Sequence, residues 1–200
     1  MDPHPSPSAG RLSKGLEQFL HGIRDSEGLR VLDLAGGSQS NIQYIAELGH
    51  KPTQDDLQHA LKESFWGGDF LANQSDPKRI ETFVSLTLDH KAGTFQAILV
   101  WDALQFLAQP LLEEVVSQLH RITAPGAQLL AYFHADAKME QTPAVTYHIV
   151  DRQTVRIAPR SYECPARFLS NRDIEKLFAA FGAIKFFVTR DHLREVIVRR

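Results

Sequence analysis

The sequence predicts an α/β domain built on a doubly wound, mostly parallel sheet of seven strands, with an antiparallel hairpin at its C-terminal end. Two observations predict this fold class. Short apolar runs alternate with segments in which apolar residues recur every three or four positions, a pattern typical of strands and helices that form a parallel sheet covered on both faces. The last two apolar runs are joined by a short link, which favours an antiparallel pair.

The first third of the chain predicts a helix, a buried strand and a glycine turn in succession. Apolar residues fall on one helical face between Leu12 and Ile23, which predicts an amphipathic helix. The run 29–34 (LRVLDL) is short and apolar, and glycines follow it almost at once, as in a buried strand that ends in a tight turn. Ser40 and Gln43 form a capping-box pattern at the start of the next helix.

The rest of the chain continues this alternation. Further strands of the sheet are predicted at 50–54, 83–88, 95–100, 128–133, 185–188 and 195–198. Further helices are predicted over the apolar stripes at 57–61, 111–122 and 171–181. Residues 64–78 are predicted to form a long loop, of the kind that often closes over a ligand. A separate hairpin is predicted from the segments 147–150 and 154–157.

The composition is that of an average soluble globular protein. The 200 residues carry a net charge of -2 with 43% hydrophobic and 23% charged residues, which excludes collagen, coiled coils and general disorder and gives no overall attraction to nucleic acid. Cys164 is the single cysteine, and the histidines lack ligand spacing, so we expect neither disulfide nor metal. We expect a disordered, proline-containing tail over 1–10, one domain over 11–200 and a cytoplasmic protein without a membrane segment.

The predicted sheet places a candidate ligand site at the carboxyl ends of its strands, beside the first strand, where doubly wound folds bind ligands. Gly36 and Gly37 follow that strand, and a turn without side chains lets a ligand approach the backbone closely. Asp55 and Asp56 follow the second strand, where a carboxylate accepts two hydrogen bonds from a ribose diol. A glycine turn also occurs where the turn alone requires it, so this motif does not decide the function.

Four segments together resemble the class I S-adenosylmethionine-dependent methyltransferase family. VLDLAGG (31–37) stands where that family has its first motif, and FQAILVWDALQFL (95–107) resembles its fourth-strand segment. LHRITAPGAQLLAYFHA (119–135) resembles the following helix, Pro-Gly turn and fifth strand, and FFVTRDHLREVIVRR (186–200) resembles the final antiparallel pair. The resemblance covers residues 12–200 and implies a Rossmann-like fold, S-adenosyl-L-methionine as cofactor and methyl transfer as activity.

The resemblance assigns seven residues to the cofactor site: Asp33, Ala35, Gly36, Gly37, Asp56, Trp101 and Asp102. Asp33 matches the acid that supports the methionine end of the cofactor, and Gly37 matches the glycine that makes room for it. Asp56 matches the acid that binds the ribose, with Asp55 as the alternative if the strand register differs by one residue.

Trp101 and Asp102 follow the predicted fourth strand, where the family's sheet opens beside the transferred methyl group. Three roles are open for Asp102: to hold a substrate amine, to bind the ammonium group of the cofactor, or to cap the next helix. Trp101 either lines the pocket or belongs to the core. Ala35 and Gln39 occupy positions where the family usually has glycine, so the turn is bulkier and the expected pocket narrower.

His134 and Asp136, which follow the predicted fifth strand, are the candidate catalytic residues. Methyl transfer from a sulfonium is an in-line displacement, so the protein mainly positions the reactants and, for a weak nucleophile, removes a proton. A histidine titrates near neutral pH and suits that role. The alternative is a histidine in a solvated loop.

We therefore expect a methyltransferase that acts on a small molecule, because no basic stripe or aromatic platform for nucleic acid is visible. The oligomeric state is left open. The alternative, suggested by Ala35 and Gln39, is a methyltransferase fold that binds a ligand or partner without catalysis. A nicotinamide-dependent oxidoreductase would share the first turn but neither the Pro-Gly turn nor the closing strand pair.

Overall fold

A computed structural model of the protein describes residues 10–36, 38–138, 140–189 and 193–200. Six strands form the main sheet: β2 (Arg30–Asp33), β3 (Lys51–Gln54), β4 (Phe95–Trp101), β5 (Thr123–His134), β8 (Ala183–Val188) and β9 (Leu193–Arg199). Three strands form a second sheet: β1 (Arg11–Leu12), β6 (Gln141–Ile149) and β7 (Thr154–Pro165). The α-helices are α1 (Lys14–Ile23), α2 (Gln39–Glu47), α3 (Leu57–Phe65), α4 (Phe70–Asn73), α5 (Pro77–Thr87), α6 (Gln109–Ile122) and α7 (Asn171–Leu177). A 3-10 helix, η1 (Ala103–Phe106), follows β4.

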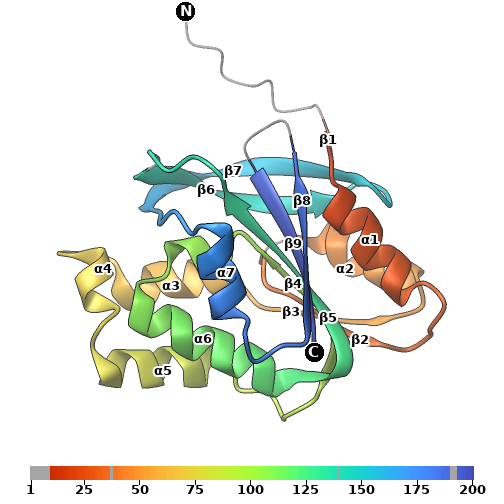
Figure 1. Ribbon diagram of the computed structural model, residues 1–200, viewed down its shortest axis with the longest axis horizontal. Coiled ribbons are helices and arrows are strands. Elements are labelled where there is room, and N and C mark those ends of the chain that lie inside the picture. The colour runs from red at the N-terminus through yellow and green to blue at the C-terminus, as the bar shows by residue number, and fades with distance from the viewer. Residues whose placement is uncertain (1–9, 37, 139, 190–192) are drawn as a thin grey trace, which may run out of the picture.

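The main sheet has the strand order β3-β2-β4-β5-β9-β8. Strands β3, β2, β4 and β5 run parallel, whereas β9 is antiparallel to both β5 and β8. The predicted closing antiparallel pair is therefore confirmed. The second sheet, with the order β1-β7-β6, lies across one end of the main strands (Figure 1).

Two hydrophobic cores lie on opposite faces of the main sheet because side chains alternate along each strand. Ile98 and Val100 of β4 belong to the core that also contains the buried residues of α3, α5, α6 and α7. Leu99 and Trp101 belong to the core that contains those of α1 and α2 together with residues of β6 and β7. The second sheet is thus packed on the same core as α1 and α2.

Polar side chains cap the helices that begin near the strand ends. Ser38 caps α2 by accepting a hydrogen bond from the Asn41 amide, so the predicted cap at Ser40 is wrong by two residues. Asp56 caps α3 in the same way. Ser170 and Asp173 form a reciprocal capping box at the start of α7.

The main sheet has six strands and not the predicted seven, because the segment 83–88 lies in α5 and at its end. A short apolar run fits a strand or a buried helix segment equally well. Asp76 at the N-cap and Pro77 in the first turn are the signals that decide for a helix. Phe83 is buried while Leu86 is 76% exposed, as expected for an amphipathic helix.

Two other predicted elements differ in extent. The expected loop at 64–78 contains the end of α3, all of α4 and the start of α5. The predicted hairpin at 147–150 and 154–157 is present, but its strands continue to Gln141 on one side and Pro165 on the other.

Of the predicted tail, residues 1–9 lie outside the described residues. In the part of the chain that the structure describes, no helix is long and apolar enough to cross a membrane.

Candidate functional site

The candidate site lies where β2, β3 and β4 end. Asp33 is the last residue of β2 and lies opposite Gln54 of β3 and Leu99 of β4. Beyond it, Ala35 forms an isolated antiparallel bridge with Asp56. The turn after β2 and the acid after β3 are therefore adjacent, as the sequence predicts.

Gly36 packs against the side chain of Asp56. Its φ is +63°, and a Cβ atom added to it would lie 2.1–2.2 Å from the carboxyl and Cβ atoms of Asp56. Both its backbone conformation and its surroundings therefore require glycine. Gly37, the other predicted glycine of the turn, lies outside the described residues.

The Asp33 carboxylate is fully buried and accepts three hydrogen bonds. The donors are Trp101 Nε1 at 2.6 Å, Asn41 Nδ2 at 2.8 Å and the Ala35 amide at 3.0 Å. Burial raises the pKa of Asp33 above its ordinary value, while these hydrogen bonds act in the opposite direction. The acid predicted to support the cofactor is thus bound by groups of the protein itself.

Asn41 connects this carboxylate to the hairpin of β6 and β7. Its Nδ2 also donates to the Tyr147 carbonyl oxygen at 2.9 Å, and its Oδ1 accepts from the Ile149 amide at 2.7 Å. The side-chain amide therefore pairs with the backbone of β6 as a neighbouring strand would. This places β6 over the end of β2.

Trp101 fills the space between the strand ends and the hairpin. Its indole lies parallel to the Tyr147 ring, with centroids 4.9 Å apart and an interplanar angle of 2°, and meets Tyr132 edge-on. The residue is 1% exposed and has a φ of +55°, which is unusual for a residue other than glycine. Trp101 is thus a core residue, and it also covers Asp33.

Asp102 lies in a buried polar cluster beside the aromatic rings. Its carboxyl group accepts hydrogen bonds from Gln58 Nε2 at 2.8 Å and Gln105 Nε2 at 3.4 Å. Burial raises its pKa to about 7, against a hydrogen bond from Tyr147 that lowers it. Its side chain makes no capping hydrogen bond to η1, so the capping alternative is wrong.

Arg160 of β7 occupies the place next to Asp56. Its guanidinium forms a bidentate ion pair with the Asp56 carboxylate, Nη1 to Oδ2 at 2.9 Å and Nη2 to Oδ1 at 3.1 Å. Nη2 also donates to the Ala35 carbonyl oxygen at 2.7 Å. Asp55, the alternative ribose-binding acid, is instead hydrogen-bonded to His90 at 3.0 Å.

The two candidate catalytic residues differ in their surroundings. His134, at the end of β5, lines a cavity of about 160 Å³ together with Arg11 and Tyr147. Asp136 is exposed, and its carboxylate accepts a hydrogen bond from the Lys138 amide at 2.9 Å. Only His134 of the pair lines this cavity beside the hairpin, and a catalytic role for either residue stays a prediction.

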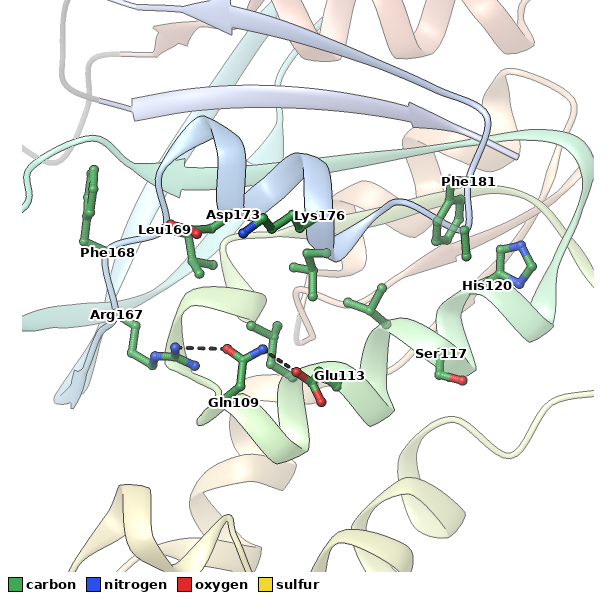
Figure 2. Close-up of a pocket in the computed structure, with 14 residues that line it drawn as sticks. Gln109, Glu113, Ser117, His120, Arg167, Phe168, Leu169, Asp173, Lys176 and Phe181 are labelled. Carbon is green, nitrogen blue, oxygen red and sulfur yellow. Dashed lines mark hydrogen bonds between the residues drawn. The ribbon is translucent and has the colours of Figure 1, made fainter.

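A larger cavity, of about 740 Å³, lies between α6 and α7. Figure 2 shows Gln109 between Arg167 and Glu113, with Arg167 Nη2 to Gln109 Oε1 at 3.1 Å and Gln109 Nε2 to Glu113 Oε1 at 2.5 Å. Its lining residues come from α6, α7 and the segments flanking α7, and include none of the seven predicted cofactor residues.

Sequence reasoning missed three residues that shape the site: Asn41, Tyr147 and Arg160. Asn41 belongs to the predicted turn region but carries no motif of its own. Tyr147 and Arg160 belong to the hairpin, whose local pattern predicts strands but not the surface on which they pack. Their roles depend on contacts between residues more than a hundred positions apart.

Solved structures resemble this chain over nearly its whole length. A 1,6-didemethyltoxoflavin-N1-methyltransferase of Burkholderia thailandensis, solved with 1,6-didemethyltoxoflavin and S-adenosylhomocysteine, aligns with a TM-score of 0.51 at 13% identity over 94% of this chain and 77% of its own. A SAM-dependent methyltransferase of Archaeoglobus fulgidus aligns with a TM-score of 0.53 at 9% identity over 92% and 91% of the two chains. The PH0226 protein of Pyrococcus horikoshii aligns with a TM-score of 0.56 at 13% identity over 93% and 88%.

The chain has the class I methyltransferase fold. The predicted fold family is therefore confirmed, with one strand fewer than expected. No protein family model matches the sequence, and no curated protein matches it. Because the identities are so low, these similarities concern the fold alone.

With the side chains arranged as in this structure, the predicted cofactor site does not fit S-adenosylmethionine. Asp33 is enclosed by Trp101 and Asn41, and Asp56 is held by Arg160. Both acids that the resemblance assigns to the cofactor are thus engaged with the chain itself. A ligand diol that binds both carboxylate oxygens of Asp56 in the same way competes with Arg160.

Proposed function

We propose that this chain is an S-adenosylmethionine-dependent methyltransferase that acts on a small molecule, in a form whose cofactor site is closed. The observation that supports it most is the placement of Asp33, Gly36 and Asp56 together at adjacent strand ends. This arrangement occurs within a fold shared with known methyltransferases. Two aspartates and a glycine that lay far apart in the fold would not support the proposal.

Two observations support a small acceptor. The hairpin of β6 and β7 covers the strand ends and leaves a cavity of about 160 Å³ beside His134, a volume that suits a small molecule. The Burkholderia relative in fold was solved with a small heterocyclic compound. In this proposal His134, and Asp136 after a loop movement, contact the acceptor or remove its proton.

Titration calorimetry of the full chain with S-adenosylmethionine, S-adenosylhomocysteine and NADH tests the proposed cofactor. We expect binding of the first two in the micromolar range or weaker, and its loss in Asp33→Asn, which keeps the size of the side chain. Asp25→Ala, at an exposed aspartate, is the control and should bind as the unchanged protein does. Circular dichroism verifies that each variant is folded.

The second candidate is a methyltransferase fold that binds a ligand or partner without catalysis. The engagement of Asp33 and Asp56 by the chain's own side chains favours it. It predicts no binding of either sulfur-containing nucleoside, even by a variant in which Arg160 no longer covers Asp56. Binding of NADH alone would instead support an oxidoreductase.

A further inference from the structure

The hairpin of β6 and β7 covers the strand ends at which the cofactor site is predicted. With β1 it forms the sheet that lies across the main strands (Figure 1). Over the predicted site it is held by polar side chains that include two anchors, Asn41 beneath β6 and Asp56 beneath β7. The Ser38 hydroxyl also lies 3.0 Å from Nδ1 of His148 in β6. The covering is therefore built from specific polar contacts and not from apolar packing alone.

The two anchors differ in kind. Asn41 binds backbone groups of β6, so this contact does not depend on any hairpin side chain. The second anchor depends on one residue, because the guanidinium of Arg160 supplies all three of its hydrogen bonds to Asp56 and Ala35. Replacing Arg160 therefore removes the second anchor and leaves the first intact.

The Arg160 guanidinium binds Asp56 through the same pattern of hydrogen bonds that a ribose diol would form. Two parallel N–H groups donate to the two carboxylate oxygens, as two neighbouring hydroxyl groups do. With Arg160 in place the Asp56 side chain is already 26% exposed, and departure of the guanidinium frees both carboxylate oxygens for a ligand diol. Arginine and ligand therefore compete for one carboxylate.

We propose that the hairpin is an intramolecular occupant of the nucleoside site and that the Arg160–Asp56 pair keeps it closed. A ligand with a ribose diol binds only molecules in which this pair is open, so its apparent dissociation constant is the intrinsic one divided by the open fraction. This inference rests on the proposed function for the identity of the nucleoside, S-adenosylmethionine.

The test compares Arg160→Ala with Arg156→Ala in the full chain. Arg156 lies on the same strand and is exposed, so its replacement removes one positive charge without opening the Asp56 contact. Hydrogen exchange of the ligand-free variants measures closure of the hairpin, and calorimetry with S-adenosylhomocysteine measures the site. We expect faster exchange of β6 and β7 and a dissociation constant at least tenfold lower in Arg160→Ala alone. Arg160→Lys, which keeps the charge but not the fork of donors, should lie between.

The outcomes separate this inference from the proposed function. Unchanged exchange of the hairpin in Arg160→Ala, or equal nucleoside affinity in both variants, would overturn the inference and leave the proposed cofactor in place. Faster exchange without any nucleoside binding would overturn the proposed cofactor and the competition with it. Faster exchange with tighter binding supports both. If Arg160→Ala proves too unstable to measure, Arg160→Lys against Arg156→Lys gives the same comparison.

Discussion

Gly36 is the residue at which the candidate site tolerates no side chain. Its φ of +63° alone disfavours alanine, and an added Cβ would overlap the Asp56 side chain at 2.1 Å. We predict that Gly36→Ala lowers the free energy of unfolding by about 3 kcal/mol, of which about 1 reflects the backbone conformation and the rest the overlap. Urea unfolding measures this loss.

Gly93→Ala is the matched control for that loss. Gly93 has a similar φ of +65°, but nothing lies within 4 Å of its added Cβ. Its replacement should cost about 1 kcal/mol. Equal losses in the two variants would show that the Asp56 side chain moves aside at little energetic cost. The predicted contribution of the overlap to the loss in Gly36→Ala would then be wrong.

A buried ion pair joins β1 to the main sheet. Glu195 of β9 is fully buried, forms an ion pair with Arg11 of β1 at 2.6 Å and accepts a hydrogen bond from the Gly15 amide at 2.5 Å. Since β1 also pairs with β7, this contact joins the two sheets. The hairpin is thus attached to the main sheet through β1 as well as over the candidate site.

We predict that Glu195→Gln lowers the free energy of unfolding by about 3 kcal/mol, because it removes the negative charge from a buried ion pair. The exposed pair of Lys14 and Glu17 provides the control, and Glu17→Gln should change stability by less than about 0.5 kcal/mol. Thermal or urea unfolding measures both. A loss below about 1 kcal/mol in Glu195→Gln would contradict a structural role for the buried pair.

Local patterns predicted the elements near the site better than the contacts between them. The strands that carry Asp33 and Trp101 follow from short apolar runs, and the adjacency of Gly36 and Asp56 follows from parallel strand order. The covering by Arg160 does not, because it depends on where a hairpin more than a hundred residues away in sequence packs. A hydrogen bond between residues so far apart in the sequence produces no periodic pattern of apolar and polar residues.

The main sheet lies between the two cores, and polar groups are enclosed where the hairpin meets the ends of its strands. Asp102 is 1% exposed there, with Gln58 and Gln105 as hydrogen-bond donors. Enclosure makes its charged form costly, so the folded protein holds the proton up to a pH of about 7. The charge of Asp102 therefore contributes to the pH dependence of global stability.

The sign of the pH dependence follows from the raised pKa. Between about pH 4 and pH 7 the folded state binds a proton at Asp102 that the unfolded state has lost, so the free energy of unfolding falls as pH rises through this range. The loss attributable to Asp102 is at most about 4 kcal/mol. Asp102→Asn stays neutral at every pH and should lack this part of the decline. Urea unfolding of both proteins at pH 4, 5.5 and 7.5 measures the difference, and parallel curves would show that Asp102 is charged in the folded protein throughout.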